Sequence, residues 1–161
     1  MVKILLLCVG RLKEDAERGF VDRYIDRFHK LGSRHGLGVG MIYEMAESQA
    51  PTPKERKAAE AAELRQKIGR KTPLMALDER GASLTSVEFA QKLAAWRDDG
   101  VKELAVVIGG PDGLDPDLVK NAQLVLSLGR LTLPHGLARV VLAEQFYRAV
   151  TILAGHPYHR A

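Results

Sequence analysis

The sequence predicts an α/β fold with a mainly parallel β-sheet flanked by helices. Short apolar runs that end at turn residues alternate along the chain with longer amphipathic segments, as expected when helices cover a parallel sheet. The length of 161 residues and the hydrophobic share of 46% are typical of one globular domain. A chain of this length buries about 68 to 70% of its unfolded surface, so we expect a single domain over residues 1–161.

The first half of the chain predicts a strand, a helix and a second strand. Residues 2–9 are short, almost wholly apolar and followed by Gly10, which indicates a buried strand. Apolar residues at helical spacing then predict a helix, and the glycine-containing region 32–40 breaks this pattern. These residues are Phe20, Tyr24, Phe28 and Leu31. Alternation over residues 37–43 predicts the second strand.

Two capping-box patterns predict helix starts in the middle of the chain. Thr52 precedes a proline and is followed by Glu55, so a helix begins there and runs to Gly69. Thr85 repeats the pattern before a helix that ends at Gly100. Between and after these helices, apolar runs predict strands at 74–77 and 104–108.

The C-terminal part predicts a short helix, a strand and a long helix. Asp115 and Pro116 open the short helix, and the strand covers residues 124–128. The last helix runs from about residue 137 to residue 153, and its first turns are apolar nearly all round. Such a helix is buried on more than one side, which favours a partner subunit.

Composition limits the class of protein. With Cys8 as the single cysteine, no intrachain disulfide can form, and the Cys/His spacing of a metal site is absent, so we expect a reducing compartment and no metal. Since no apolar run approaches ~18 residues, we expect no membrane span and a cytoplasmic protein. The net charge of +4 and the pI near 9.3 mildly favour a polyanion such as RNA.

Charged residues are unevenly distributed. The alternating charges of residues 11–35 predict a solvated helix face, and the polar residues 44–52 are the nearest thing to a spacer. Residues 129–161 carry four arginines against one acid, Glu144, together with three of the five histidines. We therefore expect the chemistry at the C-terminal end. The basic residues and histidines of that stretch are Arg130, His135, Arg139, Arg148, His156, His159 and Arg160.

Three loops follow neighbouring strands, at the edge where parallel α/β sheets bind ligands. They cover residues 78–81, 109–113 and 129–135. The glycines of the second loop suit either close approach of main-chain N–H groups to a ligand or a tight strand-to-helix turn. Residues 128–133 suit either a purine pocket of main-chain groups between leucines or an ordinary loop under the last helix.

Several enzyme classes lack their motifs. Residues 107–114 do not have the G-x-G-x-x-G spacing of a dinucleotide site, and Lys71-Thr72 lacks the glycines of a P-loop. The sequence shows no Ser/His/Asp elbow, no HExxH and no closely spaced acid pair. NAD, ATP and hydrolytic chemistry are therefore disfavoured.

The tail at residues 156–160 concentrates side chains that suit RNA chemistry. Tyrosine stacks on bases, arginine binds phosphate, and histidine exchanges a proton near neutral pH. Upstream, Glu144 and Arg148 are four residues apart on the last helix, a spacing that also fits a plain surface ion pair.

A set of ordered motifs resembles one family over the whole chain. The motifs are Val-Gly-Arg-Leu-Lys-Glu at 9–14, Val-Ile-Gly-Gly-Pro-Asp-Gly-Leu at 107–114, Leu-Thr-Leu-Pro-His at 131–135, Ala-Arg-Val-Val-Leu-Ala-Glu-Gln-Phe-Tyr-Arg-Ala at 138–149 and His-Pro-Tyr-His-Arg at 156–160. They closely resemble the ribosomal RNA large subunit methyltransferase H family. That family belongs to the SPOUT class of α/β-knot methyltransferases.

The resemblance implies a fold and an activity. It implies S-adenosylmethionine-dependent methylation of N3 of pseudouridine 1915 of 23S rRNA in the assembled ribosome. It also implies a homodimer and a C-terminal trefoil knot, which no periodicity would suggest because knots are rare exceptions among folds.

The resemblance also implies site residues. Its cofactor contacts fall on Leu77, Gly109, Leu128, Gly129, Arg130, Leu131, Thr132 and Leu133. Its polar positions near the substrate fall on Arg139, Glu144, Arg148, Tyr158, His159 and Arg160.

We assign catalytic roles within the second set. His159 accepts the N3 proton, Tyr158 and Arg160 position the nucleotide, and Arg139 holds phosphate or developing negative charge. The alternative for Arg139 is a structural pairing with Glu144.

Two other functions compete with this one. A non-catalytic ribosome-associated RNA-binding protein could keep the fold without the cofactor. A nucleotide-binding oxidoreductase would need the dinucleotide motif that the sequence lacks.

Overall fold

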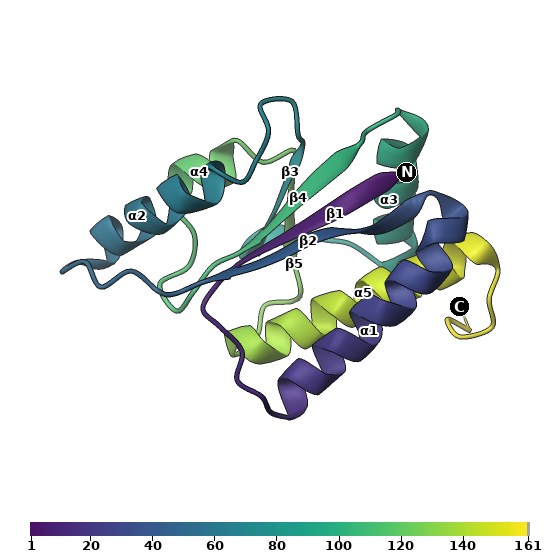
Figure 1. The fold of residues 1–161 in the computed structure, drawn as a ribbon, viewed down its shortest axis with the longest axis horizontal. Coiled ribbons are helices and arrows are strands. Elements are labelled where there is room, and N and C mark those ends of the chain that lie inside the picture. The colour runs from purple at the N-terminus through teal and green to yellow at the C-terminus, as the bar shows by residue number, and fades with distance from the viewer. Residues whose placement is uncertain (161) are drawn as a thin grey trace.

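The computed structural model describes residues 1–160 and shows a five-stranded sheet in the order β2-β1-β4-β3-β5, with every adjacent pair parallel. The predicted α/β class is confirmed (Figure 1). The strands are β1 (Val2–Val9), β2 (Leu37–Met45), β3 (Leu74–Ser83), β4 (Glu103–Ile108) and β5 (Leu124–Ser127).

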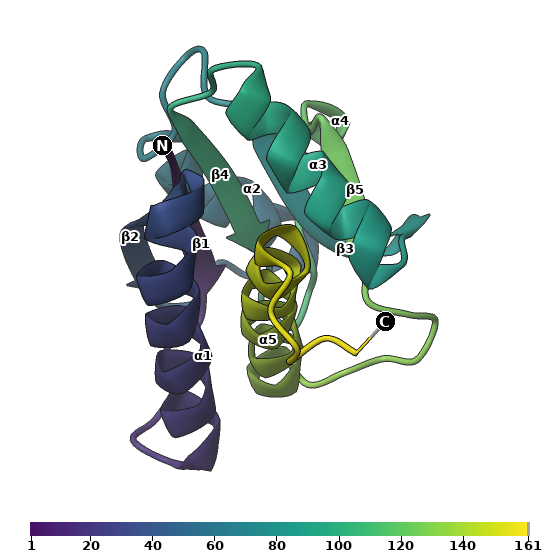
Figure 2. The ribbon, with the colours of Figure 1, turned by 90° about the vertical axis from the view of Figure 1, so that its right-hand side faces the viewer.

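Helices cover both faces of the sheet (Figures 1 and 2). Helices α1, α3 and α5 pack on one face against the side chains of Ile4 and Leu6, while α2 and α4 pack on the other face against Leu5 and Leu7. This follows from the pleat, which sends successive side chains of a strand to opposite faces. The helices are α1 (Ala16–Gly32), α2 (Pro53–Arg65), α3 (Ser86–Asp98), α4 (Pro116–Lys120) and α5 (His135–Ala154), with a 3-10 turn at Ser33–His35.

Local capping explains where the helices begin. Thr85 and Glu88 form the predicted reciprocal capping box, and the Thr52 hydroxyl accepts the N–H of Glu55. Helix α2 ends at Arg65, four residues before the predicted Gly69. The reason is that the N–H groups of residues 66–68 bond to carbonyls three residues back, which tightens the last turn out of α-helical geometry.

Strand β3 differs most from its prediction, because it extends to Ser83 instead of ending at Leu77. Its pairing with β5 is interrupted between Leu77 and Ala82, so the predicted loop 78–81 is an excursion within a strand. Gly81 lies at the end of this excursion, where a Cβ would come 2.5 Å from the carbonyl oxygen of Val125. Only glycine allows β3 to return to β5 at that point.

The arrangement of elements sets the location of the site. Strands β4, β3 and β5 are adjacent in that order in the sheet, so the ends of β4 and β5 and the excursion of β3 after Leu77 bring the three predicted loops together at one edge. Helix α5 starts at the same edge and runs back beneath the sheet beside α1 (Figure 1). The rings of Phe28 and Phe89 each lie 5.4 Å from that of Phe146, which ties α1 and α3 to α5.

Two further observations bear on expectations from composition. Cys8 is a free thiol in the core, where burial raises its pKa to about 11. Among the described residues, no helix has the length and apolar character needed to cross a bilayer. The trefoil knot stays a prediction.

Candidate active site

A cleft of about 580 Å³ lies at the carboxyl edge of the sheet, between the excursion of β3 at residues 78–81 and the loops that follow β4 and β5. Its floor includes Ile108 and its far side the first turn of α5. Seven of the eight predicted cofactor residues line it: Leu77, Gly109, Leu128, Gly129, Leu131, Thr132 and Leu133. The side chain of Arg130 is exposed and does not line the cleft.

The glycine-rich loop after β4 is a tight turn that also forms one wall of the cleft. The N–H of Gly113 donates to the carbonyl of Gly110 at 2.9 Å, and a Cβ on Gly109 would come 2.7 Å from the backbone of Gly113. Arg56 of α2 holds this loop from outside through two hydrogen bonds to Asp112, of 2.7 and 3.2 Å. The loop is therefore a tight strand-to-helix turn, and this geometry is compatible with the alternative prediction that its main-chain N–H groups approach a ligand.

The loop after β5 forms the opposite wall and is mostly apolar. Its backbone is shaped by Gly129, whose φ of +132° is rare for other residues, and by the Ser127 hydroxyl, which hydrogen-bonds both the N–H and the carbonyl of Gly129. Leu131 is 83% exposed at the mouth of the cleft. Main-chain groups and leucines thus face the same space.

Arg139 lies beneath the cleft, with its side chain only 2% exposed. Its guanidinium donates to Glu44 at 2.6 Å and to the carbonyls of Val9 and Gly10 at 3.0 and 2.5 Å. The predicted alternative partner, Glu144, is wrong, because the acid that Arg139 meets is Glu44. Both terminal nitrogens are occupied by the protein itself, so the predicted contact of Arg139 with phosphate does not fit this arrangement.

Glu44 corrects a second expectation, because it belongs to β2 and is no part of a spacer. Its carboxylate accepts hydrogen bonds from Arg18 at 2.7 Å, from the N–H of Leu12 at 2.9 Å and from Arg139. Burial alone would raise the pKa of Glu44, but these donors outweigh it and hold that pKa below its ordinary value. Sequence reasoning missed Glu44, since nothing local marks a partner 95 residues away.

The tail follows the last turn of α5 and folds back so that Tyr158 reaches the middle of this helix. Glu144 accepts hydrogen bonds from Arg148 at 2.6 Å and from the hydroxyl of Tyr158 at 2.9 Å. The ring of Tyr158 lies 4.6 Å from that of Tyr147, with the guanidinium of Arg148 5.1 Å from its centre. The Glu144–Arg148 pair is therefore more than a surface ion pair, since it anchors the tail. His159 follows with a buried Nδ1 that has no partner within residues 1–160.

Within one chain, the tail and the cleft lie at opposite ends of α5. Helix α5 has 20 residues and is therefore about 30 Å long. The cleft meets its first turn, whereas the tail follows its last turn (Figures 1 and 2). The structure thus brings the predicted cofactor residues together but does not bring Tyr158, His159 or Arg160 to them.

An apolar surface borders the cleft on the outer side of α5. Leu137 and Val141, one turn apart, are 44% and 37% exposed, and Leu133 of the preceding loop is 36% exposed. Val87 at the start of α3 is also exposed. Such neighbouring apolar side chains are typical of a protein contact.

Comparisons with known proteins agree with the resemblance. A family model described as predicted SPOUT methyltransferase matches residues 2–159. Proteins named ribosomal RNA large subunit methyltransferase H are similar: that of Brucella anthropi is 49% identical over 160 residues, covering 99% of this chain and 100% of the relative. That of Rhizobium etli is 50% identical over 159 residues, covering 99% of each.

A solved structure is similar in fold. It is that of a probable methylase family protein from Haemophilus influenzae Rd KW20, with a TM-score of 0.51 and 15% sequence identity. The match covers 97% of this chain and 69% of the other.

The hydrogen bonds of Glu44 predict a pH dependence of stability. Because its pKa is lower in the folded chain than in the unfolded chain, its contribution is complete above the unfolded value near 4.5 and is lost as pH falls through the folded value. We expect Glu44→Gln to lower the free energy of unfolding at pH 7 by about 2 kcal/mol or more. The difference from the unmodified chain shrinks towards pH 3, as measured by urea denaturation.

Glu14→Gln is the matched control, because Glu14 also faces Arg18 but is 96% exposed. It leaves the stability unchanged at both pH values. A Glu44→Gln deficit that is the same at pH 7 and pH 3 would contradict the assigned role of the carboxylate.

Proposed function

Because this chain belongs to the SPOUT methyltransferase family, we propose that it methylates 23S rRNA in the ribosome, at N3 of pseudouridine 1915, with S-adenosylmethionine as donor. The observation that carries the proposal is that the β3 excursion at residues 78–81 and the loops after β4 and β5 line one cleft. The relatives are named as ribosomal RNA methyltransferases, which supports the class of substrate.

The cleft fits S-adenosylmethionine. Its volume lies within the range of about 300 to 1,000 Å³ that is typical of small-molecule sites. Leucines at 77, 128 and 133 supply apolar walls for a purine ring, and the main chain of residues 128–133 supplies hydrogen-bonding groups for its edge. Arg130 contributes only its main chain to this proposal.

The reaction is a methyl transfer with inversion. Bound S-adenosylmethionine supplies a methyl carbon activated by the adjacent sulfonium, and the S–CH3 bond breaks as the N3–CH3 bond forms. The proton on N3 must leave so that the lone pair can attack. We assign His159 as its acceptor, which contributes about 10² to 10⁴ in rate, with Tyr158 and Arg160 aligning the nucleoside.

The tail and the cleft of one chain lie apart, but a second copy of the chain can bring its tail to this cleft. We propose a homodimer in which the tail of one chain reaches the cleft of the other, with the apolar surface of Leu133, Leu137 and Val141 at the contact. Glu144 and Arg148 then act on the substrate side by holding the tail. Arg139 acts as a positioning residue for α5.

The dimer also bears on RNA affinity. One chain carries a net charge of +4, and two carry 2 × 4 = +8. Since each neutralised phosphate adds salt-sensitive affinity, we expect productive recognition to need the dimer and the structured ribosome, and free rRNA fragments to be poor substrates. A ribosomal substrate places the proposed activity in the cytoplasm, and we retain the trefoil knot as part of the proposed fold.

The competing proposal is a ribosome-associated RNA-binding protein without chemistry. It has no need of S-adenosylmethionine, so binding of this cofactor discriminates between the two.

Cofactor binding is expected to depend on the backbone at Gly129. Gly129→Ala strains a φ of +132° although a Cβ has open space there, and we expect the dissociation constant for S-adenosylmethionine to rise about tenfold, which corresponds to ~1.4 kcal/mol. Gly100→Ala is the matched control, since Gly100 also has a positive φ and open space but lies after α3. Titration calorimetry measures both, and equal affinities in the two variants would remove residues 128–133 from the cofactor site.

The reaction itself is tested in cells. Removing the protein is expected to leave the pseudouridine-containing fragment of 23S rRNA lighter by one methyl group, as measured by mass spectrometry. Restoring the Gly129→Ala chain is expected to return only part of the methyl group. An unchanged mass after removal would overturn the proposed substrate.

The role of His159 is tested by single-turnover methylation of ribosomes. A general base typically contributes about 10² to 10⁴ in rate, so we expect the single-turnover rate of His159→Ala at pH 8 to be lower than that of the unmodified enzyme by this factor. Full activity of the variant would end the assignment.

Mixing variants tests the proposed exchange of tails. A mixed dimer of Gly129→Ala and His159→Ala chains has one intact site only if each cleft uses its partner's tail. At low cofactor concentration, random mixing is then expected to restore about a quarter of the intact sites. No restoration would show that each chain uses its own tail.

A further inference from the structure

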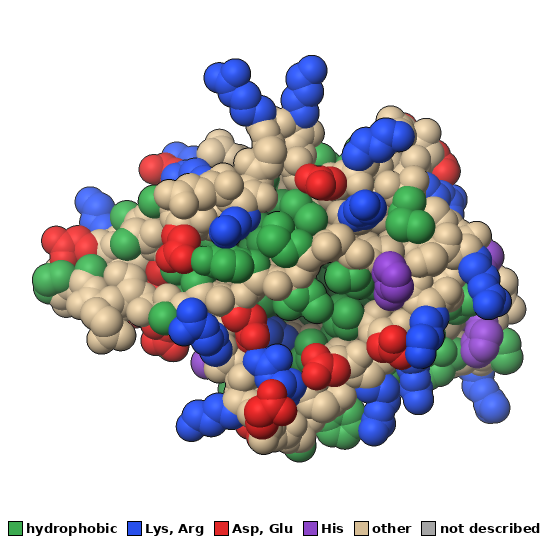
Figure 3. All heavy atoms as spheres, viewed as in Figure 1, with side chains coloured by type: hydrophobic (Ala, Val, Ile, Leu, Met, Phe, Trp, Pro, Cys, Tyr) green, Lys and Arg blue, Asp and Glu red, His purple; other side chains and the backbone are tan. Residues whose placement is uncertain are grey.

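The outer face of α1 carries a row of basic side chains that neither the cleft nor the tail uses. Arg23, Arg27 and Lys30 of α1 and Arg34 of the following 3-10 turn recur at spacings of four, three and four, so they share one face. All four are exposed, opposite the side on which Val21 and Phe28 enter the core. Lys and Arg side chains project from this part of the surface, at the lower right of Figure 3.

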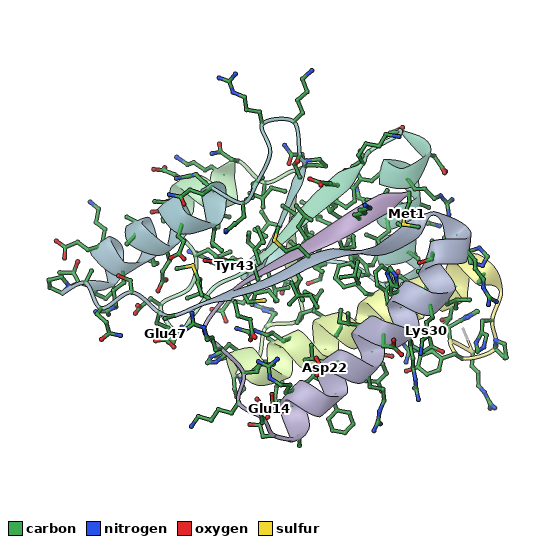
Figure 4. The ribbon with its side chains drawn as sticks, in the orientation of Figure 1. Met1, Glu14, Asp22, Lys30, Tyr43 and Glu47 are labelled. Carbon is green, nitrogen blue, oxygen red and sulfur yellow. The ribbon has the colours of Figure 1, made fainter. Side chains whose placement is uncertain are left out.

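Three of these cations have no carboxylate partner in the described chain. Lys30 forms an ion pair with Asp26 at 2.8 Å. Figure 4 labels Lys30 and a different acid of the same helix, Asp22. No ion pair within residues 1–160 involves Arg23, Arg27 or Arg34. The row therefore keeps three uncompensated guanidinium groups.

The spacing of the row works against the helix itself. Arg23 and Arg27 are four residues apart on α1, and like charges at this spacing destabilise a helix by about 0.2 to 0.5 kcal/mol. The exposed acids of this part of α1, Asp22 and Asp26, lie beside the row, and of the row's four cations only Lys30 forms an ion pair, with Asp26. A polyanion bound along the row would remove the repulsion.

Aromatic rings hold two of these arginines and connect the row to the tail. Arg23 lies 5.4 Å from the ring centre of Phe20, and Arg27 lies 6.0 Å from those of both Tyr24 and Tyr147. The tail residue Tyr158 packs on the other side of this cluster, with its ring 4.6 Å from that of Tyr147. The row is thus continuous with the segment assigned to the nucleoside.

We propose that the row Arg23–Arg27–Arg34 is a phosphate-binding surface that holds an rRNA strand leading to the tail. The inference rests on the proposed function for the identity of the RNA. From Arg23 to Arg34, eleven residues at about 1.5 Å each span about 16 Å, enough for contacts with successive phosphates of one strand. Stacked guanidiniums expose their N–H edges, which bind phosphate in pairs.

The chemistry of the face favours RNA over a membrane. A membrane-binding helix needs a broad apolar face beside its cations, whereas Phe20 is the only exposed large apolar side chain of α1. The apolar residues of α1 are instead buried against α5 and the sheet. An acidic protein is the other partner that could bind this basic row, and the test below distinguishes it from RNA.

The test compares the salt dependence of binding in two variants of equal charge. Arg23→Gln/Arg34→Gln removes two cations from the row and leaves Arg27 in the tyrosine cluster. Arg70→Gln/Lys71→Gln removes two exposed cations from the loop before β3, which lies across the sheet from α1 (Figure 1). Binding to purified ribosomes and to deproteinised 23S rRNA is measured from about 50 to 200 mM salt.

We expect the row variant alone to lower the slope of log affinity against log salt by about 1.4 to 1.8 on both RNA preparations, since each lost phosphate contact removes ~0.7 to ~0.9. Equal slopes in the two variants would overturn the proposal. If the row variant lowered the slope on ribosomes but not on deproteinised rRNA, the row would bind an acidic ribosomal protein instead, and this result would also overturn the proposal.

S-adenosylmethionine affinity separates this test from the proposed function. The affinity is expected to be the same in both variants and the unmodified chain, because neither pair lines the cleft. If no chain binds the cofactor, the proposed methyl transfer fails while the slopes still decide whether the row binds RNA.

Discussion

The guanidinium of Arg139 joins the ends of β1 and β2 to the first turns of α5, and the shape of the cleft follows from that junction. Strand β5 lies three positions from β1 in the sheet, about 14 Å at ~4.8 Å per strand. Arg139 of α5 bonds to the carbonyls at the end of β1, so residues 128–134 must cover this distance between β5 and α5. They therefore cross the sheet edge at β3 and β4. That crossing places their main chain opposite Leu77 and Gly109.

The same junction has an energetic cost that explains its composition. Burial of a guanidinium costs several kcal/mol, which pairing offsets without a large surplus. Two carbonyls, those of Val9 and Gly10, together with a second cation, Arg18, surround the Glu44–Arg139 pair and satisfy most of its hydrogen-bonding groups. The Nε of Arg139 has no partner in residues 1–160. The network fixes the position of the first turns of α5, and this in turn fixes the loop between β5 and α5.

Short-range signals predicted the elements, whereas long-range pairing determined the site. Thr52, Thr85 and the apolar runs specify local structure through neighbours a few residues away, and those predictions are confirmed apart from the extent of α2, β2 and β3. Glu44 was misread because its partners, Arg18 and Arg139, are set by the sheet order. The loops were found from the rule for parallel sheets. The residue types of the tail indicated RNA chemistry, whereas the roles of its individual residues were assigned only after the family resemblance.

The length of α5 constrains the geometry of the proposed dimer. The apolar surface centres between Leu137 and Val141, about 6 Å from the start of α5 and about 22 Å from its end at ~1.5 Å per residue. In a two-fold contact the same surface meets itself. Parallel helices would place both tails together, far from either cleft. Antiparallel helices carry the end of each α5 past the start of the partner's α5, and because Tyr158 folds back to Glu144, each tail then lies near the first turn of the partner's α5, which lines the partner's cleft. The separation of cleft and tail within one chain therefore selects the antiparallel arrangement.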